Sequence, residues 1–149
     1  MSRRKGRILA FQALYSWDVS KSSIDDLLTY SWLQKDSELS EENVQEPSEN
    51  AKEERTFASL IIAGTIDHVD EIDKVIESHL SDSWSLGRLN KVALAILRTS
   101  TYEIIYQKSV SPKIIIDEAV NIAKDYGTDD SYKFINAVLD KIGKDEVDK

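Results

Sequence analysis

The sequence predicts an all-α protein, and three observations lead to this fold class. Apolar residues recur at spacings of three and four along most of the 149 residues, as they do on the buried face of a helix. Only two prolines and five glycines interrupt the chain, which favours long helices over a fold with many turns. An alternating apolar and polar pattern of useful length is absent. The length fits one domain, which we expect to cover residues 1–149.

The first part of the chain predicts two helices and an acidic loop. Residues 3–20 carry apolar side chains on one broad face, which indicates an amphipathic helix. A shorter helix is expected over 25–33, with Ser22 or Ser23 as its N-cap. Residues 35–50 are rich in acidic side chains and serine and poor in apolar ones, so they cannot bury enough surface to offset the entropy of ordering. We therefore expect a mobile acidic loop over 35–50.

The middle of the chain predicts two long helices joined by a turn. One is expected over 52–80, with Gly64 on its apolar stripe. A glycine there costs about 1 kcal/mol relative to alanine, so we expect another helix to approach closely at that point. Residues 81–87, which include Trp84, form a turn region, and the next helix is expected over 88–107.

The last two helices have clear start and stop signals. Ser111 followed by Pro112 is typical of an N-cap and a first helical position, and Gly127 is well placed to end that helix. A final helix is expected over 130–142, with Gly143 at its end.

Catalytic and membrane functions find little support in the residues. Cysteine is absent, no phosphate-binding glycine motif occurs, and neither histidine has an evident nucleophile beside it in sequence. His68 and His79 are eleven residues apart, which on one helix is ~16 Å, too far to share a metal. No apolar run is long enough for a membrane span, and the N-terminus lacks the features of a secretory signal. We therefore expect a cytoplasmic protein that is not an enzyme and has no metal or cofactor.

The distribution of charge indicates a nucleic acid as a ligand. The net charge is −8, but Arg3, Arg4, Lys5 and Arg7 place four positive charges ahead of the first acid, Asp18. Of 19 basic residues 15 then remain against 27 acidic ones, so the rest of the chain has a net charge of −12. Such an arm can contact RNA phosphates, although basic N-termini are often without function. Four charges support only modest affinity, so we expect a second contact surface or a partner.

Four segments, in order along nearly the whole chain, are similar to the NusB family of bacterial transcription antitermination proteins. They are RRKGR with QALYSW within 3–17, LRTSTYEI at 97–104, Pro112 with IDEAV at 116–120, and DSYKFINAVLD at 130–140. Three features depart from the family pattern. Ile8 stands where an acidic residue is common, Ala137 replaces a glycine and could alter a helix contact, and the acidic loop is longer than usual.

The resemblance implies a fold and a function that the residues alone do not define. The implied fold has about six or seven helices in two packed small helical bundles. The implied protein pairs with the small-subunit ribosomal protein known as NusE, binds single-stranded boxA RNA of nascent transcripts, and helps the transcribing RNA polymerase complex read through terminators in ribosomal RNA operons. By motif, the RNA-binding residues would be Arg3, Arg4, Lys5, Arg7, Asp130, Lys133 and Phe134, with Tyr15 at the RNA or partner face.

Two other functions stay open from the sequence. One is a helical adaptor that binds only proteins and uses its basic tail to contact an acidic partner. The other is RNA modification, because NusB-like domains also occur fused to RNA cytosine methyltransferases. The second is least favoured, since the chain has no methyltransferase domain and no candidate nucleophile. The sequence does not locate the contact with the ribosomal protein.

Overall fold

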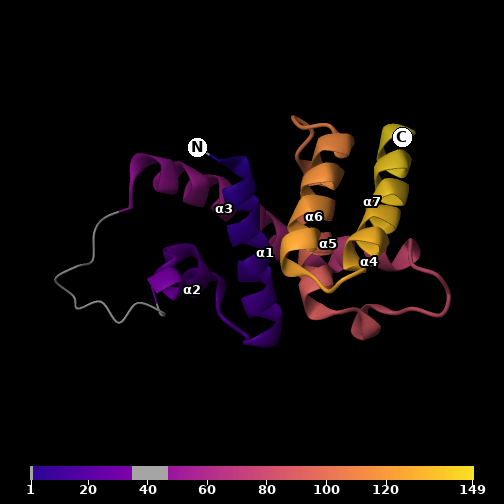
Figure 1. Ribbon diagram of the computed structural model, residues 1–149, viewed down its shortest axis with the longest axis horizontal. Coiled ribbons are helices and arrows are strands. Elements are labelled where there is room, and N and C mark those ends of the chain that lie inside the picture. The colour runs from indigo at the N-terminus through magenta and orange to yellow at the C-terminus, as the bar shows by residue number, and fades with distance from the viewer. Residues whose placement is uncertain (1, 35–46) are drawn as a thin grey trace.

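A computed structural model describes residues 2–34 and 47–149, and within these ranges the chain is helical without strands. Figure 1 shows the arrangement of the elements. They are α1 (Arg3–Val19), α2 (Ile24–Thr29), the 3₁₀ turn η1 (Ser31–Gln34), α3 (Glu49–Asp67), α4 (Val69–Ser78), the 3₁₀ turn η3 (Leu86–Arg88), α5 (Lys91–Tyr106), α6 (Pro112–Tyr126) and α7 (Ser131–Val147).

The helices form two small groups that share one central helix. In Figure 1, α1, α2 and α3 lie together on one side, and α4, α6 and α7 lie around α5 on the other. Helix α5 packs against α1, α3, α4, α6 and α7. This arrangement confirms the predicted all-α class and the two packed bundles.

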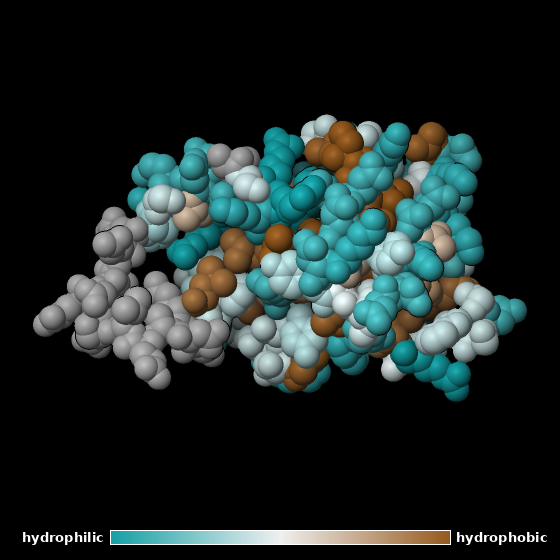
Figure 2. All heavy atoms as spheres, viewed as in Figure 1, coloured by the Kyte–Doolittle hydropathy of each residue, from teal (hydrophilic) through white to brown (hydrophobic). Residues whose placement is uncertain are grey.

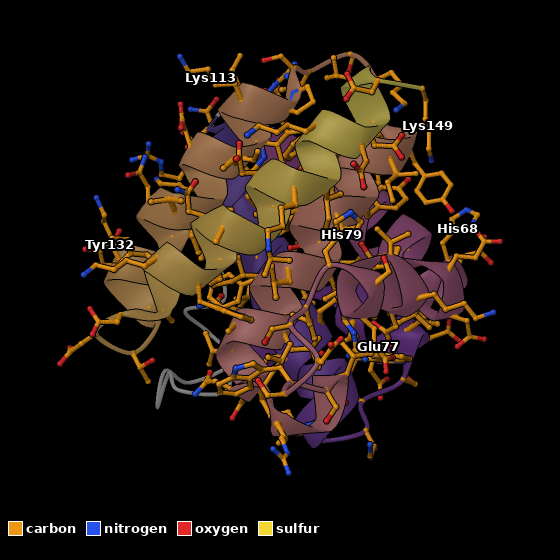
Figure 3. The ribbon with its side chains drawn as sticks, turned by 90° about the vertical axis from the view of Figure 1, so that its right-hand side faces the viewer. His68, Glu77, His79, Lys113, Tyr132 and Lys149 are labelled. Atoms are coloured by element: carbon orange, nitrogen blue, oxygen red, sulfur yellow. The ribbon has the colours of Figure 1, made fainter. Side chains whose placement is uncertain are left out.

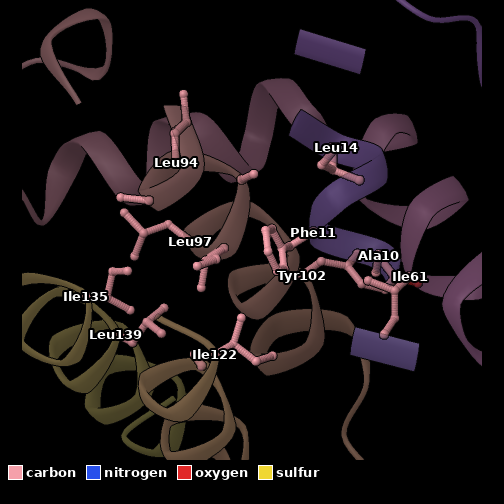
Figure 4. Packing of buried hydrophobic residues seen from close by; sticks show 14 of the residues in the cluster. Ala10, Phe11, Leu14, Ile61, Leu94, Leu97, Tyr102, Ile122, Ile135 and Leu139 are labelled. Atoms are coloured by element: carbon pink, nitrogen blue, oxygen red, sulfur yellow. The ribbon is translucent and has the colours of Figure 1, made fainter. Parts of the chain in front are cut away.

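The core runs through both groups without a break. Leu14 and Ile61 come from the first group and Leu139 from the second, and Leu97 of α5 lies between them, each at most 2% exposed. Figure 4 shows these side chains packed around α5. Because apolar burial contributes roughly 25 cal/mol per Å², the central position of α5 makes it the main contributor to the shared core.

Short polar side chains start several of the helices. The hydroxyl oxygens of Ser2, Ser23 and Ser48 accept hydrogen bonds from backbone N–H groups of α1, α2 and α3, at 3.2, 3.1 and 3.1 Å. The side-chain oxygen of Asn90 accepts from two N–H groups at the start of α5. These contacts satisfy donors that a helix leaves without partners, and they select Ser23 rather than Ser22 as the cap of α2.

Two of the predicted helices have different limits. Helix α2 ends at Thr29 because Tyr30 adopts a left-handed conformation with φ of 58°, and the chain continues as η1. The expected helix over 52–80 is two helices, since the backbone leaves the helical region at His68 (φ −110°, ψ 18°). The apolar pattern continues across this break because α4 turns to pack against α5.

The limits of the acidic loop are also different. Helix α3 begins at Glu49, so Glu49 and Asn50 are helical and the prediction of a loop to residue 50 was wrong there. Residues 35–46 of the predicted loop lie outside the described residues. Ser48 supplies the cap that sequence reasoning overlooked within this acidic stretch.

Glycines of α3 and α7 lie at close helix contacts. A Cβ atom at Gly64 would be 2.1 Å from Cζ of Tyr102 on α5, which confirms the predicted close approach. Helix α7 does not end at Gly143 but continues to Val147. A Cβ at Gly143 would lie 3.3 Å from Cβ of Pro112, so this glycine permits packing on α6. Ala137 is exposed, so the expected effect of this departure on a helix contact was wrong.

Candidate nucleic-acid interface

The basic arm is the first turn of α1, and the protein holds it in place. The backbone N–H of Ser2 donates to Oε1 of Glu54 at 3.1 Å, which fixes the start of the helix against α3. Arg3 and Lys5 are exposed, and the Arg3 guanidinium lies 5.7 Å from the ring centre of Phe57. Two positive charges therefore project into solvent from an ordered backbone.

Arg4 is exposed but engaged with α6. Its Nε and Nη2 donate to the two carboxylate oxygens of Glu118 at 2.9 and 3.0 Å. The hydrogen bond raises the pKa of Arg4 and lowers the pKa of Glu118. An RNA phosphate that binds Arg4 must therefore compete with this carboxylate.

Arg7 does not belong to the exposed arm. The residue is 9% exposed, and its Nε and Nη2 donate to the Glu103 carboxylate of α5 at 2.9 to 3.2 Å. One face of its guanidinium lies 5.4 Å from the ring centre of Phe57. The expectation that Arg7 contacts RNA is corrected here, because its charge is paired inside the protein and ties α1 to α5.

Tyr15 lines a surface groove on the side of α1 that also carries Arg4, farther along the helix from the arm. Residues 4, 11 and 15 lie on one side of the helix, and there the Phe11 and Tyr126 rings pack in a T-shaped arrangement with ring centres 5.3 Å apart. The groove beside this contact is lined by Phe11, Gln12, Tyr15, Ser16, Trp32, Val92 and Tyr126. Tyr126 is 46% exposed, so its ring is available to stack on a base.

The start of α7 places a second set of charged and aromatic side chains on the surface. Asp130 precedes the helix, and its Oδ1 lies 3.6 Å from Nζ of Lys133. The Tyr132 ring is flanked by Nζ of Lys124 at 5.1 Å and of Lys133 at 5.9 Å. Figure 3 shows Tyr132 at the edge of the molecule. Because both ammonium groups lie over this ring, Tyr132 helps to hold Lys124 and Lys133 at the surface, where the two cations can contact phosphates.

Phe134 has a more buried environment than the prediction implies. It is half-buried and packs against the core, and its ring centre lies 6.2 Å from that of Trp84. Only part of the Phe134 ring therefore faces outward, beside an indole that is 49% exposed.

Helix α6 contacts both groups. Glu118 contacts the arm and Lys124 contacts Tyr132, and these two residues lie about 9 Å apart along the helix axis and about a third of a turn apart around it. We use the name α1–α6 surface for the surface side chains of both groups, which are Arg3, Arg4, Lys5, Tyr15, Lys124, Tyr126, Tyr132 and Lys133. Sequence reasoning missed Lys124, Tyr126 and Tyr132, because Tyr126 continues an apolar stripe and the other two have no local signal.

Other kinds of site receive no support from the described part of the chain. Within residues 2–34 and 47–149, no cluster of three His, Cys, Asp or Glu side chains could hold a metal ion. His68 and His79 lie at opposite ends of α4. No helix among the described residues is long and apolar enough to cross a membrane.

An all-helical fold that carries a basic arm and surface aromatic rings is typical of a helical nucleic-acid-binding protein. Comparison with known sequences makes this class specific. The sequence model of the NusB family matches residues 4–144, and the chain belongs to that family.

Curated relatives agree along almost their whole length. The transcription antitermination protein NusB of Treponema denticola is 52% identical over 142 residues, which covers 95% of this chain and 96% of the relative. The NusB protein of Borreliella burgdorferi is 40% identical, with 93% and 91% covered. Both relatives are named as transcription antitermination proteins, which agrees with the prediction that the chain is not an enzyme.

Solved structures show the same fold. T. maritima NusB superimposes with a TM-score of 0.77 at 30% identity, covering 100% of this chain and 99% of that one. A crystal structure of the antitermination factors NusB and NusE in complex with double-stranded RNA contains a similar chain, with a TM-score of 0.76, 29% identity and 96% of each chain covered.

Proposed function

We propose that this chain is a transcription antitermination factor that binds boxA RNA of nascent transcripts together with a NusE-type ribosomal protein. In this role it acts in the cytoplasm on the transcribing RNA polymerase complex and promotes read-through in ribosomal RNA operons. Family membership across nearly the whole chain supports the role. The observation that supports the RNA contact is the α1–α6 surface, where exposed cations occur together with the exposed ring of Tyr126 and the partly buried rings of Tyr15 and Tyr132.

Each group on this surface has a distinct task in the proposal. Arg3, Arg4 and Lys5 contact phosphates, and Tyr15 and Tyr126 stack on bases in the groove between them. At the start of α7, Lys133 contacts a further phosphate. Asp130 and Phe134 belong to the same proposed contact. Asp130 accepts a hydrogen bond from a base amino group or a 2′-hydroxyl, and the outward part of the Phe134 ring stacks on a base.

A partner protein is part of the proposal for an electrostatic reason. The salt slope is the change in the logarithm of the binding constant with the logarithm of the salt concentration. For a single strand it is about −0.7 per neutralised phosphate, so three arm charges give only about −2. Carboxylates such as Glu118 and Asp125 lie beside the arm and oppose RNA binding. A basic ribosomal protein bound next to this surface adds both contact area and positive charge.

The test compares two double variants with the same change of charge. Arg3→Gln/Lys5→Gln removes the exposed cations of the arm, while Lys141→Gln/Lys144→Gln removes two exposed lysines of α7. RNA binding is measured by fluorescence anisotropy with a boxA-like single strand, its scrambled version and a duplex form. Each RNA is used with and without the ribosomal protein and at two salt concentrations.

We expect wild-type chain to bind the boxA-like strand weakly alone and more tightly with the ribosomal protein. The arm variant should lower the magnitude of the salt slope by about 1.4, while the α7 control changes it little. Equal loss in both variants would remove the arm from the RNA site. Failure to bind any of the RNAs, with the ribosomal protein still bound, would favour the adaptor that binds only proteins.

A further inference from the structure

The pair between Arg4 and Glu118 places a protein carboxylate where an RNA phosphate would bind the arm. Nε and Nη2 of Arg4 donate to Oε2 and Oε1 of Glu118 at 2.9 and 3.0 Å. These two nitrogens form one edge of the guanidinium, and arginine uses the same paired geometry to bind phosphate oxygens. Glu118 therefore occupies a position on Arg4 that an RNA strand would use.

The two partners of this pair differ in exposure. The side chain of Arg4 is 52% exposed, whereas that of Glu118 is 19% exposed. The carboxylate is thus the more enclosed partner, and the longer guanidinium side chain has room to turn toward another acceptor. Because solvent screens an exposed ion pair, the contact can be exchanged, unlike the buried pair between Arg7 and Glu103.

The surroundings of Glu118 keep its carboxylate ionised. The hydrogen bond from Arg4 lowers the pKa of Glu118, burial opposes this change, and the charges of Arg4 and Arg7 lower the pKa further. Asp125 also attracts the Arg4 guanidinium. Residues 118 and 125 are seven positions apart and therefore lie on the same side of α6. An acidic edge of α6 thus lies beside the basic arm.

The packing that positions the arm does not depend on this pair. Helix α1 packs mainly against α3 and α5. The backbone N–H of Ser2 also holds the start of α1 to Glu54 of α3. We therefore expect the arm to stay in place when the contact between Arg4 and Glu118 is lost.

We propose that Glu118 limits the RNA affinity of the arm by competing with phosphates for Arg4. When a strand binds, Arg4 exchanges one anion for another, so the net gain from this contact is small. The exchange is the same for every strand, because phosphate contacts carry no sequence information. Glu118 thus weakens binding of any RNA that offers phosphates alone, and base contacts and the partner protein must supply the rest. This inference rests on the proposed function, which supplies the RNA.

The test measures RNA binding of the full chain by fluorescence anisotropy, with the boxA-like strand and its scrambled version, with and without the ribosomal protein. Glu118→Gln removes the charge and retains the size of the side chain. The matched control is Asp117→Asn, because Asp117 is exposed on the same turn of α6 but lines the groove between α6 and α7. Arg4→Gln and Arg4→Gln/Glu118→Gln complete a double-mutant cycle. Urea unfolding of each variant verifies that it folds.

We expect Glu118→Gln to bind both RNAs about three to ten times more tightly than wild type, because Arg4 becomes available to a phosphate. The salt slope should become more negative by about 0.7, the value for one more neutralised phosphate. Asp117→Asn should stay within about twofold of wild type, since solvent screens its charge. In the Arg4→Gln background, Glu118→Gln should change the affinity less than about twofold, because no guanidinium remains to be released.

Unchanged or weaker RNA binding by Glu118→Gln, beside a wild-type chain that binds RNA, would overturn the competition alone. Weaker binding would mean that Glu118 orients Arg4 toward the strand. An equal gain in the Arg4→Gln background or in Asp117→Asn would also overturn the competition, because the effect would then come from net charge. A wild-type chain that binds neither RNA, even with the ribosomal protein, would overturn the proposed function and the inference with it.

Discussion

Two arginines one turn apart in α1 have very different environments. Arg4 forms its pair with Glu118 on the surface, with its own side chain 52% exposed. Arg7 forms its pair with Glu103 where the two side chains are 10% and 4% exposed. Solvent screens the first pair, whereas loss of one partner in the second leaves a buried charge without compensation.

Arg7→Met is therefore expected to lower the free energy of unfolding by about 3–5 kcal/mol. Arg4→Gln should have a much smaller effect, because its partner can be hydrated. Urea unfolding followed by circular dichroism measures both. The double variant Arg7→Met/Glu103→Leu should recover much of the loss, since two apolar groups replace the pair. If Arg7→Met were as stable as Arg4→Gln, the structural role assigned to Arg7 would be wrong.

At the scale of the helices, the crossing of α3 and α5 depends on Gly64. The Tyr102 ring occupies the space that a side chain at position 64 would need, and this ring is 8% exposed. The Tyr102 hydroxyl also accepts a hydrogen bond from Nε2 of Gln107 at 3.2 Å. Moving the ring would therefore disturb the crossing of the two helices.

Gly64→Ala is expected to destabilise the protein despite the better helix propensity of alanine. The propensity gain is about 1 kcal/mol, while forced overlap in a packed contact costs about 1–3 kcal/mol. Gly87→Ala is the control, because no atom lies within 4 Å of a Cβ built there. Urea midpoints compare the two variants with wild type. In a Tyr102→Leu background the same Gly64→Ala change should cost less, and an equal cost there would contradict the overlap.

At the scale of the whole molecule, α5 connects the two helical groups by charge as well as by apolar packing. Arg98 of α5 donates to both carboxylate oxygens of Asp73 on α4, at 2.9 and 2.8 Å. Its guanidinium lies 5.7 Å from the ring centre of Trp17 on α1. One side chain of α5 therefore contacts elements of both groups.

Figure 2 shows that most of the surface in its view is hydrophilic, with hydrophobic residues near the start of α6 and the end of α7, where Ile114 and Val147 are exposed.

Because both groups share α5, we expect residues 1–149 to unfold as one cooperative unit. Trp17 and Trp32 lie in the first group and Trp84 lies beside α7, so tryptophan fluorescence reports on both. The urea transitions measured by fluorescence and by far-ultraviolet circular dichroism should coincide, with a slope of about 1–3 kcal/mol per M. Separate midpoints would mean that the two groups unfold independently, against the prediction of a single domain.

The sequence by itself determined the helical class, most helix starts and the family. These features depend on signals within a few residues, such as the periodicity of apolar side chains and the Ser111–Pro112 start of α6. The family resemblance likewise depends on short motifs that remain adjacent in sequence. Such signals do not require knowledge of which helices pack together.

Only the tertiary structure decided how individual residues are used. Arg7 and Arg4 belong to the same basic run, but Glu103 comes from α5 and Glu118 from α6, so their burial depends on which helix packs at each position. The break at His68 and the continuation of α7 through Gly143 also follow from packing on other helices. Burial and electrostatic environment are properties of contacts between distant segments, and therefore only the folded arrangement defines them.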